Sequence, residues 1–275
     1  MEKIIDAVPV EDIIKELTEE RFVRKTNFGH NEIYIVNAHN APNTMREIGR
    51  LREWSFRESG GGTGKSMDID EFDTRDEAYF EQLIVWDPVE KEILGGYRFI
   101  ECNKLPVKNN GQVDTPTSEL FYYSEDFIKN YLPYTIELGR SFIQPKYQST
   151  GNVRKSIFTL DNLWDGLGAV LKQTPNAKYF FGKVTMYSQY DEALRDMILF
   201  FMHKFFPHND NLIYPYPEVA IKTKARTAIM KLRLDGDNYQ NSYRTLSKYI
   251  RENGSVIPPL FNAYMSLPAT MKTFG

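Results

Sequence analysis

Charged residues that could do chemistry lie inside or beside apolar segments between positions 67 and 140. An acidic cluster at 68–73 comes first, Arg98 then interrupts an apolar run, and Glu137 and Arg140 sit in a third strand-like segment. Burying a lone carboxylate or guanidinium costs several kcal/mol, so each of these groups needs a partner. Opposite charges from separate strands would suit a polar site in a sheet, and a set of structural ion pairs is the alternative.

The composition is that of an ordinary soluble globular chain. Of 275 residues, 41% are hydrophobic, and 34 basic residues against 37 acidic ones give a net charge of -3, so no global attraction to nucleic acid is expected. Cys102 is the only cysteine, which excludes an internal disulfide and a thiolate zinc cluster, and no carboxylate–histidine spacing predicts a metal site. The chain lacks a signal-peptide core and any apolar run near the ~20 residues of a membrane span. We therefore expect a cytoplasmic protein, at most peripheral to the inner face of a membrane.

The elements that must position the charged residues follow from hydrophobic periodicity. Helices are expected over 10–22, from a cap at Asn43 or Thr44 onward, and over 153–173 and 191–205, and strands over 32–37, 81–86, 92–101, 134–143 and 177–186. Arg52 lies on or beside the apolar face of the second helix, where spacing alone favours a solvated side chain. The order of elements indicates a single α/β or α+β core.

A glycine-rich segment at 59–66 invites a phosphate-loop interpretation. The spacing is wrong, because Ser59 stands where that motif needs glycine, and the segment neither follows a buried strand nor opens a helix. We instead interpret the segment 59–66 as a mobile flap over a site.

Two further segments favour anionic partners. The turn before the helix at 153–173 would present unpaired backbone N–H groups to an anion such as phosphate, with Arg154 and Lys155 adding positive charge. Residues 222–251 carry an excess of basic side chains, which indicates either a solvated helix face or a docking surface for an acidic partner or anionic lipid. We predict a core at 1–215 and a basic C-terminal extension at 216–275 that packs on it.

Taken as a set, several motifs resemble the acyl-carrier-dependent branch of the GNAT N-acyltransferase superfamily. That branch holds the hemolysin-like ornithine-lipid and glycine-lipid N-acyltransferases and, more distantly, the acyl-homoserine-lactone synthases. The matching motifs cover roughly 45–205 and read LREWSF at 51–56, DIDEFD at 68–73, GYR at 96–98, FYYSE at 121–125, ELGRS at 137–141 and QPKY at 144–147.

The resemblance implies a GNAT fold, a mixed and splayed sheet with helices on both faces. It implies no permanently bound cofactor and a fatty-acyl phosphopantetheine thioester as co-substrate, carried by acyl carrier protein or coenzyme A. The usual pyrophosphate turn is here 148–153 and lacks its last small residue, which favours a carrier-borne donor. Relatives are expected to continue past Gly275, so a terminal segment could be missing.

The site residues implied by the resemblance fall into three groups. The expected catalytic residues are Glu137, Arg140 and Asp70; the substrate-binding residues are Arg52, Phe56, Asp73 and Arg98; and the phosphopantetheine-binding residues are Gln148, Gly151, Asn152, Arg154 and Lys155.

Acyl transfer to an amine requires a base, and Glu137 is the candidate, because burial raises the pKa of a carboxylate. The competing view is that Glu137 only pairs with Arg140 or Arg98. On a regular strand, positions 137 and 140 face opposite ways, so a bulge at Gly139 would be needed to bring them together and would free N–H groups for the thioester oxygen. Arg98 or Arg140 could hold an acceptor carboxylate.

The leading hypothesis is an enzyme that moves a long-chain fatty or 3-hydroxyacyl group from acyl carrier protein to the amino group of glycine or ornithine, in amino-acid lipid biosynthesis. The alternatives are an acyl-homoserine-lactone-type signal synthase and a non-catalytic module that binds a carrier protein or a membrane.

Overall fold

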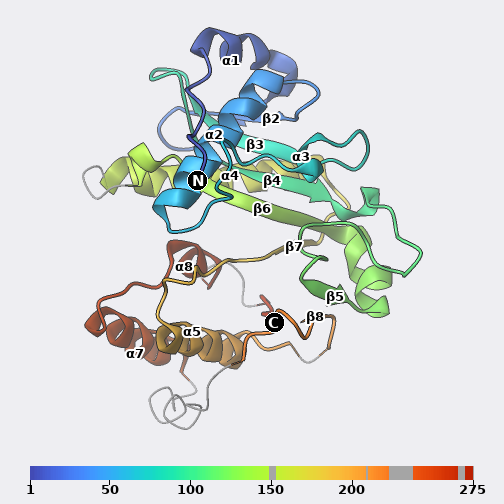
Figure 1. Cartoon of the computed structure of the whole chain (residues 1–275), viewed down its shortest axis with the longest axis vertical. Helices are drawn as coiled ribbons and strands as arrows, with labels where there is room; N and C mark the ends of the chain where they lie inside the picture. Colours follow the sequence, from blue (N-terminus) through green and yellow to red (C-terminus); the bar gives the residue numbers. More distant parts are fainter. Residues whose placement is uncertain (149–152, 209, 223–237, 266–269, 275) are drawn as a thin grey trace. The chain divides into compact units, whose positions relative to one another are not determined.

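The computed structural model of the chain describes residues 1–148, 153–208, 210–222, 238–265 and 270–274, with 153–160 described by their backbone alone. The chain divides into two compact units (Figure 1). The first comprises Met1–Lys108, Val113–Thr115 and Lys129–Lys183, and the second comprises Asn109–Gln112, Pro116–Ile128 and Val184–Gly275. Residues 184–215 therefore group with the C-terminal part, and the predicted domain boundary at 215 stays a prediction.

The first unit is built on a six-stranded sheet in the order β1-β2-β3-β4-β6-β7. Its strands are β1 Phe22–Lys25, β2 Glu32–Val36, β3 Glu81–Asp87, β4 Glu92–Glu101, β6 Thr135–Ile143 and β7 Tyr179–Gly182. Every neighbouring pair is antiparallel except β6 and β7, which run parallel. The predicted mixed sheet is confirmed, although the last strand is shorter than the predicted 177–186.

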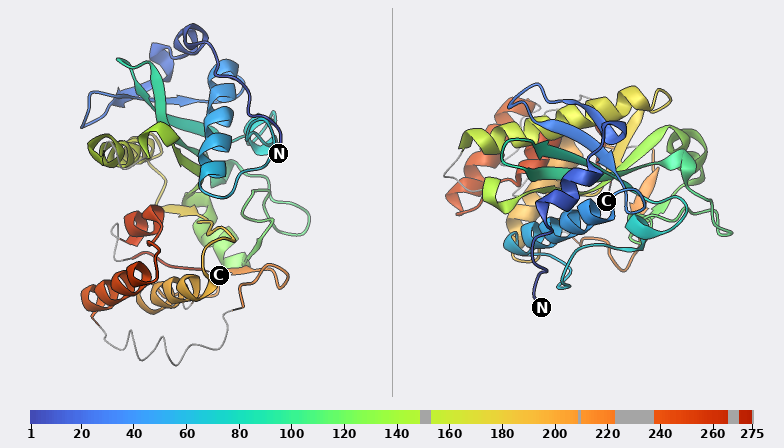
Figure 2. Two further views of the ribbon diagram at one scale, coloured as in Figure 1. Left: turned by 60° about the vertical axis from the view of Figure 1, so that its left-hand side comes forward. Right: turned by 90° about the horizontal axis from the view of Figure 1, so that it is seen from above.

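Helices cover both faces of this sheet, as predicted (Figure 2). The helices of the unit are α1 Val10–Glu16, α2 Pro42–Glu58, α3 Glu71–Thr74 and α4 Val153–Gln173. Alternate residues of β3 serve the two faces, because side chains alternate along a strand. Leu83 and Val85 pack with Leu163 and Leu167 of α4, whereas Ile84 packs on the α1 and α2 side.

The second unit has its own hydrophobic core. Its elements are β5 Phe121–Tyr123, α5 Glu192–Phe205, β8 Ile213–Pro215, α7 Tyr239–Glu252 and α8 Pro259–Met265. Strands β5 and β8 pair antiparallel. The buried residues Phe201 of α5, Leu246 and Ile250 of α7 and Phe261 of α8 belong to one cluster. Leu246 and Ile250 thus mark the face that α7 buries.

The N-terminus of α2 is capped by a residue from another helix. The predicted cap at Asn43 or Thr44 is wrong, because the helix begins at Pro42 and its own N-cap, Ala41, makes no side-chain cap hydrogen bond. Instead, the Glu16 carboxylate accepts from the backbone N–H groups of Asn43 at 3.0 Å and Thr44 at 2.7 Å. A carboxylate there satisfies two first-turn donors and complements the positive end of the helix dipole.

Replacing this cap should destabilise the first unit. We expect Glu16→Ala to lower the free energy of unfolding by about 1–2 kcal/mol, the usual cost of a lost helix cap. Urea denaturation followed by circular dichroism measures it. Glu11→Ala, on the exposed side of the same helix α1, is the matched control. Equal stabilities of the two variants would contradict the capping role.

Candidate functional site

Four buried polar side chains form the inner layer of a charged cluster in the first unit. The Asp73 carboxylate contacts both Arg52 and Arg98 at 3.2 Å, and it accepts a hydrogen bond from the Gln82 amide at 3.0 Å. Arg52 also donates to Gln82. The side chains of Arg52, Asp73 and Arg98 are at most 2% exposed. The expectation of a solvated Arg52 is therefore wrong, because carboxylate and amide partners from α3 and β3 make its burial possible.

Local structure explains how the acidic partners reach the arginines. Asp70 is the N-cap of α3 and accepts from the Phe72 N–H, while Asp73 accepts from the Asp70 N–H, which together form a capping box. This short helix therefore holds both carboxylates against Arg98 of strand β4. Gln82 lies directly opposite Arg98 in the register of β3 and β4.

An outer layer of the cluster reaches solvent. Asp70 accepts two hydrogen bonds from the Arg98 guanidinium, at 2.7 and 2.8 Å. The Arg140 Nε atom lies 2.9 Å from Asp68 Oδ2, and Arg140 Nη2 lies 3.6 Å from Asp70 Oδ2. The Arg140 and Asp70 side chains are 32% and 29% exposed, so a small molecule can reach this edge of the cluster.

The electrostatics of Asp73 and Arg98 favour the charged forms of both side chains. Burial alone would raise the pKa of Asp73, but the charges of Arg52 and Arg98 outweigh burial and lower it. Burial would lower the pKa of Arg98, but Asp73 and Asp70 outweigh it and raise it. Burial prevails at two other positions, where it lowers the pKa of Arg52 and raises the pKa of Asp68.

Strand β6 contains the predicted bulge at Gly139. Arg98 pairs with Gly139 and Gly96 with Phe142, so β6 has one residue more than β4 between these pairs. Arg140, within the bulge, has a φ of 48°. A Cβ atom on Gly139 would lie 3.4 Å from the Arg98 Nε atom, so this face of β6 turns toward the cluster.

Glu137 lies two residues before the bulge and is 2% exposed. Side chains two positions apart on a strand share a face, so Glu137 and Gly139 both face the side on which Arg98 lies. Burial and the charge of Glu137 together raise the pKa of the neighbouring Cys102 thiol. The carboxylates that contact the cluster's arginines are Asp68, Asp70 and Asp73.

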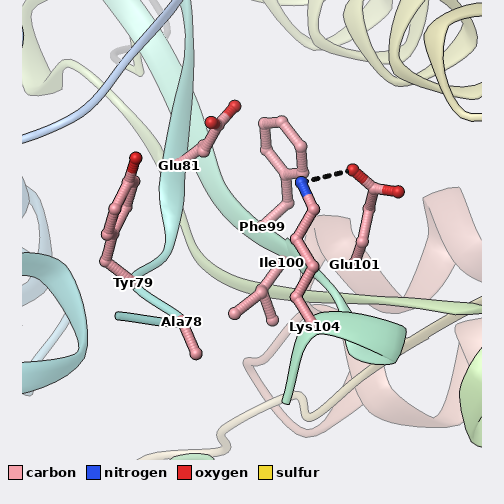
Figure 3. Close-up of a pocket in the computed structure, with 7 residues that line it drawn as sticks. All are labelled: Ala78, Tyr79, Glu81, Phe99, Ile100, Glu101 and Lys104. Atoms are coloured by element: carbon pink, nitrogen blue, oxygen red, sulfur yellow. Dashed lines mark ion pairs between the residues drawn. The ribbon is translucent and has the colours of Figure 1, made fainter. Parts of the chain in front are cut away.

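A small cavity of about 150 Å³ opens next to this part of the sheet (Figure 3). It is lined by Ala78, Tyr79, Glu81, Phe99, Ile100, Glu101 and Lys104. Ile100, in this lining, is the register partner of Glu137 on β6. Lys104 pairs with Glu101 at 2.7 Å, and burial raises the pKa of Glu81. The lining holds two acidic residues, Glu81 and Glu101, and one basic residue, Lys104, which favours a cationic over an anionic ligand.

The remaining predicted site residues lie outside the charged cluster or outside the described residues. Phe56 is half-buried and packs with the apolar residues on the α1 and α2 face of the sheet. The Gln148 amide donates to Ser55 Oγ at 2.8 Å and to the Ile143 carbonyl. Gly151 and Asn152 lie outside the described residues, and the side chains of 154 and 155 do as well. The predicted anion-binding turn therefore stays a prediction.

The glycine-rich segment at 59–66 is organised around an internal carboxylate. Glu53 of α2 accepts from the Thr63 N–H at 2.9 Å, the Gly64 N–H at 2.8 Å and the Thr63 hydroxyl at 2.7 Å. Burial would raise the pKa of Glu53, but these hydrogen bonds and the one from Arg57 lower it. Backbone groups that a phosphate would need are thus engaged by Glu53, which argues against a nucleotide-binding loop and against a freely mobile flap.

Removing this carboxylate should release the segment. We expect Glu53→Gln to speed amide hydrogen exchange at Thr63 and Gly64 by about tenfold or more, because bonds to a charged acceptor are the stronger ones. Exchange followed by mass spectrometry measures the effect. Glu58→Gln, near the end of the same helix and exposed, should leave both amides unchanged. Unaltered exchange in Glu53→Gln would contradict the role of Glu53 as the organiser of the segment.

Three important residues carry roles that the sequence did not indicate. Gln82 is the one polar residue inside the apolar run 82–86, which could have marked it. Asp68 belongs to the acidic cluster, but nothing in the sequence pairs it with Arg140. Glu53 carries no sequence signal at all, because its partners in the segment are chiefly backbone groups.

Two negative findings concern metals and membranes. Among the described residues, no group of three or more histidine, cysteine, aspartate or glutamate side chains could hold a metal ion. No helix of the described part is both long and apolar enough to cross a bilayer.

Comparison with known proteins defines the class. Residues 51–156, which contain the charged cluster and the bulge, match the acetyltransferase (GNAT) domain family. Over its whole length the chain is 51% identical to a glycine N(alpha)-acyltransferase of Bacteroides thetaiotaomicron, of which it covers 81%. It is 48% identical to a glycine N(alpha)-acyltransferase of Phocaeicola vulgatus, of which it covers 83%. The chain therefore belongs to the GNAT superfamily of N-acyltransferases, and it is an acyltransferase.

Proposed function

We propose that this enzyme transfers a long-chain fatty acyl group, including 3-hydroxyacyl groups, from acyl carrier protein to the amino group of glycine, as a step in amino-acid lipid synthesis. The observation that carries the proposal is the identity to two relatives, both named glycine N(alpha)-acyltransferase. Over the whole of this chain, the identity is 51% to one and 48% to the other. The bulged strand beside a partly exposed arginine supports it.

The acyl donor would lie along the free part of β6. Pairing of β6 with β7 runs from Thr135 to Leu138, where β7 ends at Gly182, while β6 continues to Ile143. Parallel strands that separate in this way expose backbone N–H groups, which can bind the phosphopantetheine arm and the thioester oxygen. The bulge at 139–140 marks the position for the thioester carbonyl.

Glu137 would take the proton of the amine. The neutral nitrogen then attacks the thioester carbon. As the C–N bond forms and the C–S bond breaks, the nitrogen loses its second proton, which passes to the departing thiolate to give the amide and a thiol. A buried carboxylate is a stronger base than a solvated one, which suits it to this task.

Arg140 is the better candidate for the carboxylate of glycine. Arg98 is 2% exposed and gives two hydrogen bonds to Asp70, whereas Arg140 is 32% exposed and its contact with Asp70 is 3.6 Å long. A planar guanidinium can grip a carboxylate with two parallel hydrogen bonds. Arg98, Arg52 and Asp73 then form the support that holds Asp70 and the bulge.

The test is an assay of the purified protein with acyl carrier protein thioesters, coenzyme A thioesters and a panel of amino acids. Mass spectrometry should detect N-acylglycine, formed faster from the carrier-borne donor. A lactone product with S-adenosylmethionine would instead identify a signal synthase. Absence of any acylated amino acid with either donor would refute the proposal.

Contact with an anionic membrane is a further part of the proposal. In the second unit, Arg244, Lys248 and Arg251 are exposed on α7, opposite its buried Leu246 and Ile250. Such a basic face is attracted to acidic lipid headgroups. Sedimentation with vesicles that contain or lack anionic lipid would test this, and equal binding to both would remove it.

A further inference from the structure

Arg140 needs an external constraint to hold its guanidinium in one place. Its backbone has a φ of 48°, a left-handed conformation that non-glycine residues rarely adopt. Its side chain is long, flexible and 32% exposed. An arginine in this position binds a small carboxylate well only if its orientation is fixed before the ligand arrives.

Asp68 contacts Arg140 at the inner end of the guanidinium. The Arg140 Nε atom lies 2.9 Å from Asp68 Oδ2, and the Asp68 side chain is 2% exposed. This contact is an ion pair without hydrogen-bond geometry, and the Nε atom is buried. Nη2 lies 3.6 Å from Asp70 Oδ2, so the exposed part of the side chain lies away from Asp68. Asp70 is less able to set this orientation, because both of its oxygens already accept from Arg98.

The backbone of Asp68 is itself rigidly held. Its N–H donates to the Gly49 carbonyl of α2 at 2.9 Å. The next residue, Ile69, packs so closely on the helix that a Cβ atom on Gly49 would lie 2.6 Å from it. Close packing of this kind leaves the backbone little room to move. The Asp68 carboxylate is therefore held in one position next to Arg140.

We propose that Asp68 is a positioning residue, which acts through Arg140 to orient its guanidinium for the carboxylate of the amino-acid acceptor. This inference rests on the proposed function of the site. It assigns to Asp68 a role in acceptor selection rather than in the acyl-transfer step.

The first test compares Asp68→Asn with the wild type in acceptor kinetics. We expect the KM for glycine to rise at least about tenfold, the scale of a lost contact between charged groups, with the KM for the acyl donor unchanged. The preference for glycine over glycinamide, which lacks the carboxylate, should fall by a similar factor. Arg140→Lys should do the same, and the double variant should be no worse than either single one.

A matched control separates positioning from general destabilisation. Glu47→Gln also removes a buried carboxylate that pairs with an arginine, Arg50, on the helix that packs against Asp68. It should leave the preference for glycine over glycinamide unchanged. If Asp68→Asn alters this preference no more than Glu47→Gln does, the positioning role is refuted.

A second measurement does not depend on activity. In 15N NMR relaxation of arginine side chains, the Nε–H signal of Arg140 should report an ordered side chain in the wild type and a more mobile one in Asp68→Asn. An unchanged signal would overturn the inference even if the enzyme acylates nothing. If the signal changes but the purified protein acylates no amino acid, the missing activity refutes the proposed function. The effect of Asp68 on the orientation of Arg140 would still stand.

Discussion

Glu137→Gln should lower kcat by about a hundredfold or more, the usual loss when a positioned acid–base group is removed. The amide of glutamine keeps the size of the side chain but cannot accept the proton of the amine. The side chain is 2% exposed and faces the side of β6 on which Arg98 lies, so no bulk water can readily replace it. Steady-state assay with an acyl thioester and glycine measures the effect.

Two comparisons show whether the loss reflects proton transfer. A weakly basic amine, which is already neutral at the assay pH, should lose much less rate in Glu137→Gln than glycine does. Glu92→Gln, at the other end of β4 and paired with Lys146, should retain the wild-type kcat. A well-folded Glu137→Gln enzyme with a normal rate on glycine would remove Glu137 from the mechanism.

Arg52→Met should destabilise the first unit by about 3–5 kcal/mol, because it leaves a buried carboxylate without one of its charged partners. Arg52 is 0% exposed and contacts Asp73, which is 1% exposed. The pKa of Asp73, lowered by Arg52 and Arg98 against the effect of burial, should rise in this variant. Chemical denaturation of the purified variant measures the loss.

The control for this variant lies on the same helix. Arg46→Met replaces an exposed arginine of α2 and should change stability by no more than about 0.5 kcal/mol. A similar loss in both variants would mean that the arginine side chain matters only for helix α2 itself. A loss below about 1 kcal/mol in Arg52→Met would contradict a stabilising role for the ion pair.

The charged cluster could be predicted in part, since charges within apolar segments require partners. Periodicity also located the strands that carry Arg98 and Glu137, and the glycine of the ELGRS motif marked the bulge. The motif set indicated the GNAT fold, with which the family match over 51–156 and the mixed sheet agree. The turn at 148–153 and the domain boundary at 215 stay predictions.

The sequence by itself determined that Arg98 and Glu137 lie on strands and need partners, because both conclusions follow from local pattern and the cost of desolvation. Only the tertiary structure decided which arginine is enclosed and which is open. Arg52 is buried because Asp73 and Gln82 reach it from other elements, whereas Arg140 stays accessible because Asp68 meets only its inner end and Asp70 is itself partly exposed. The same holds for Glu16 and Glu53, which accept from backbone N–H groups that the fold brings to them. Burial is a property of long-range contacts, and spacing along one strand or helix does not contain it.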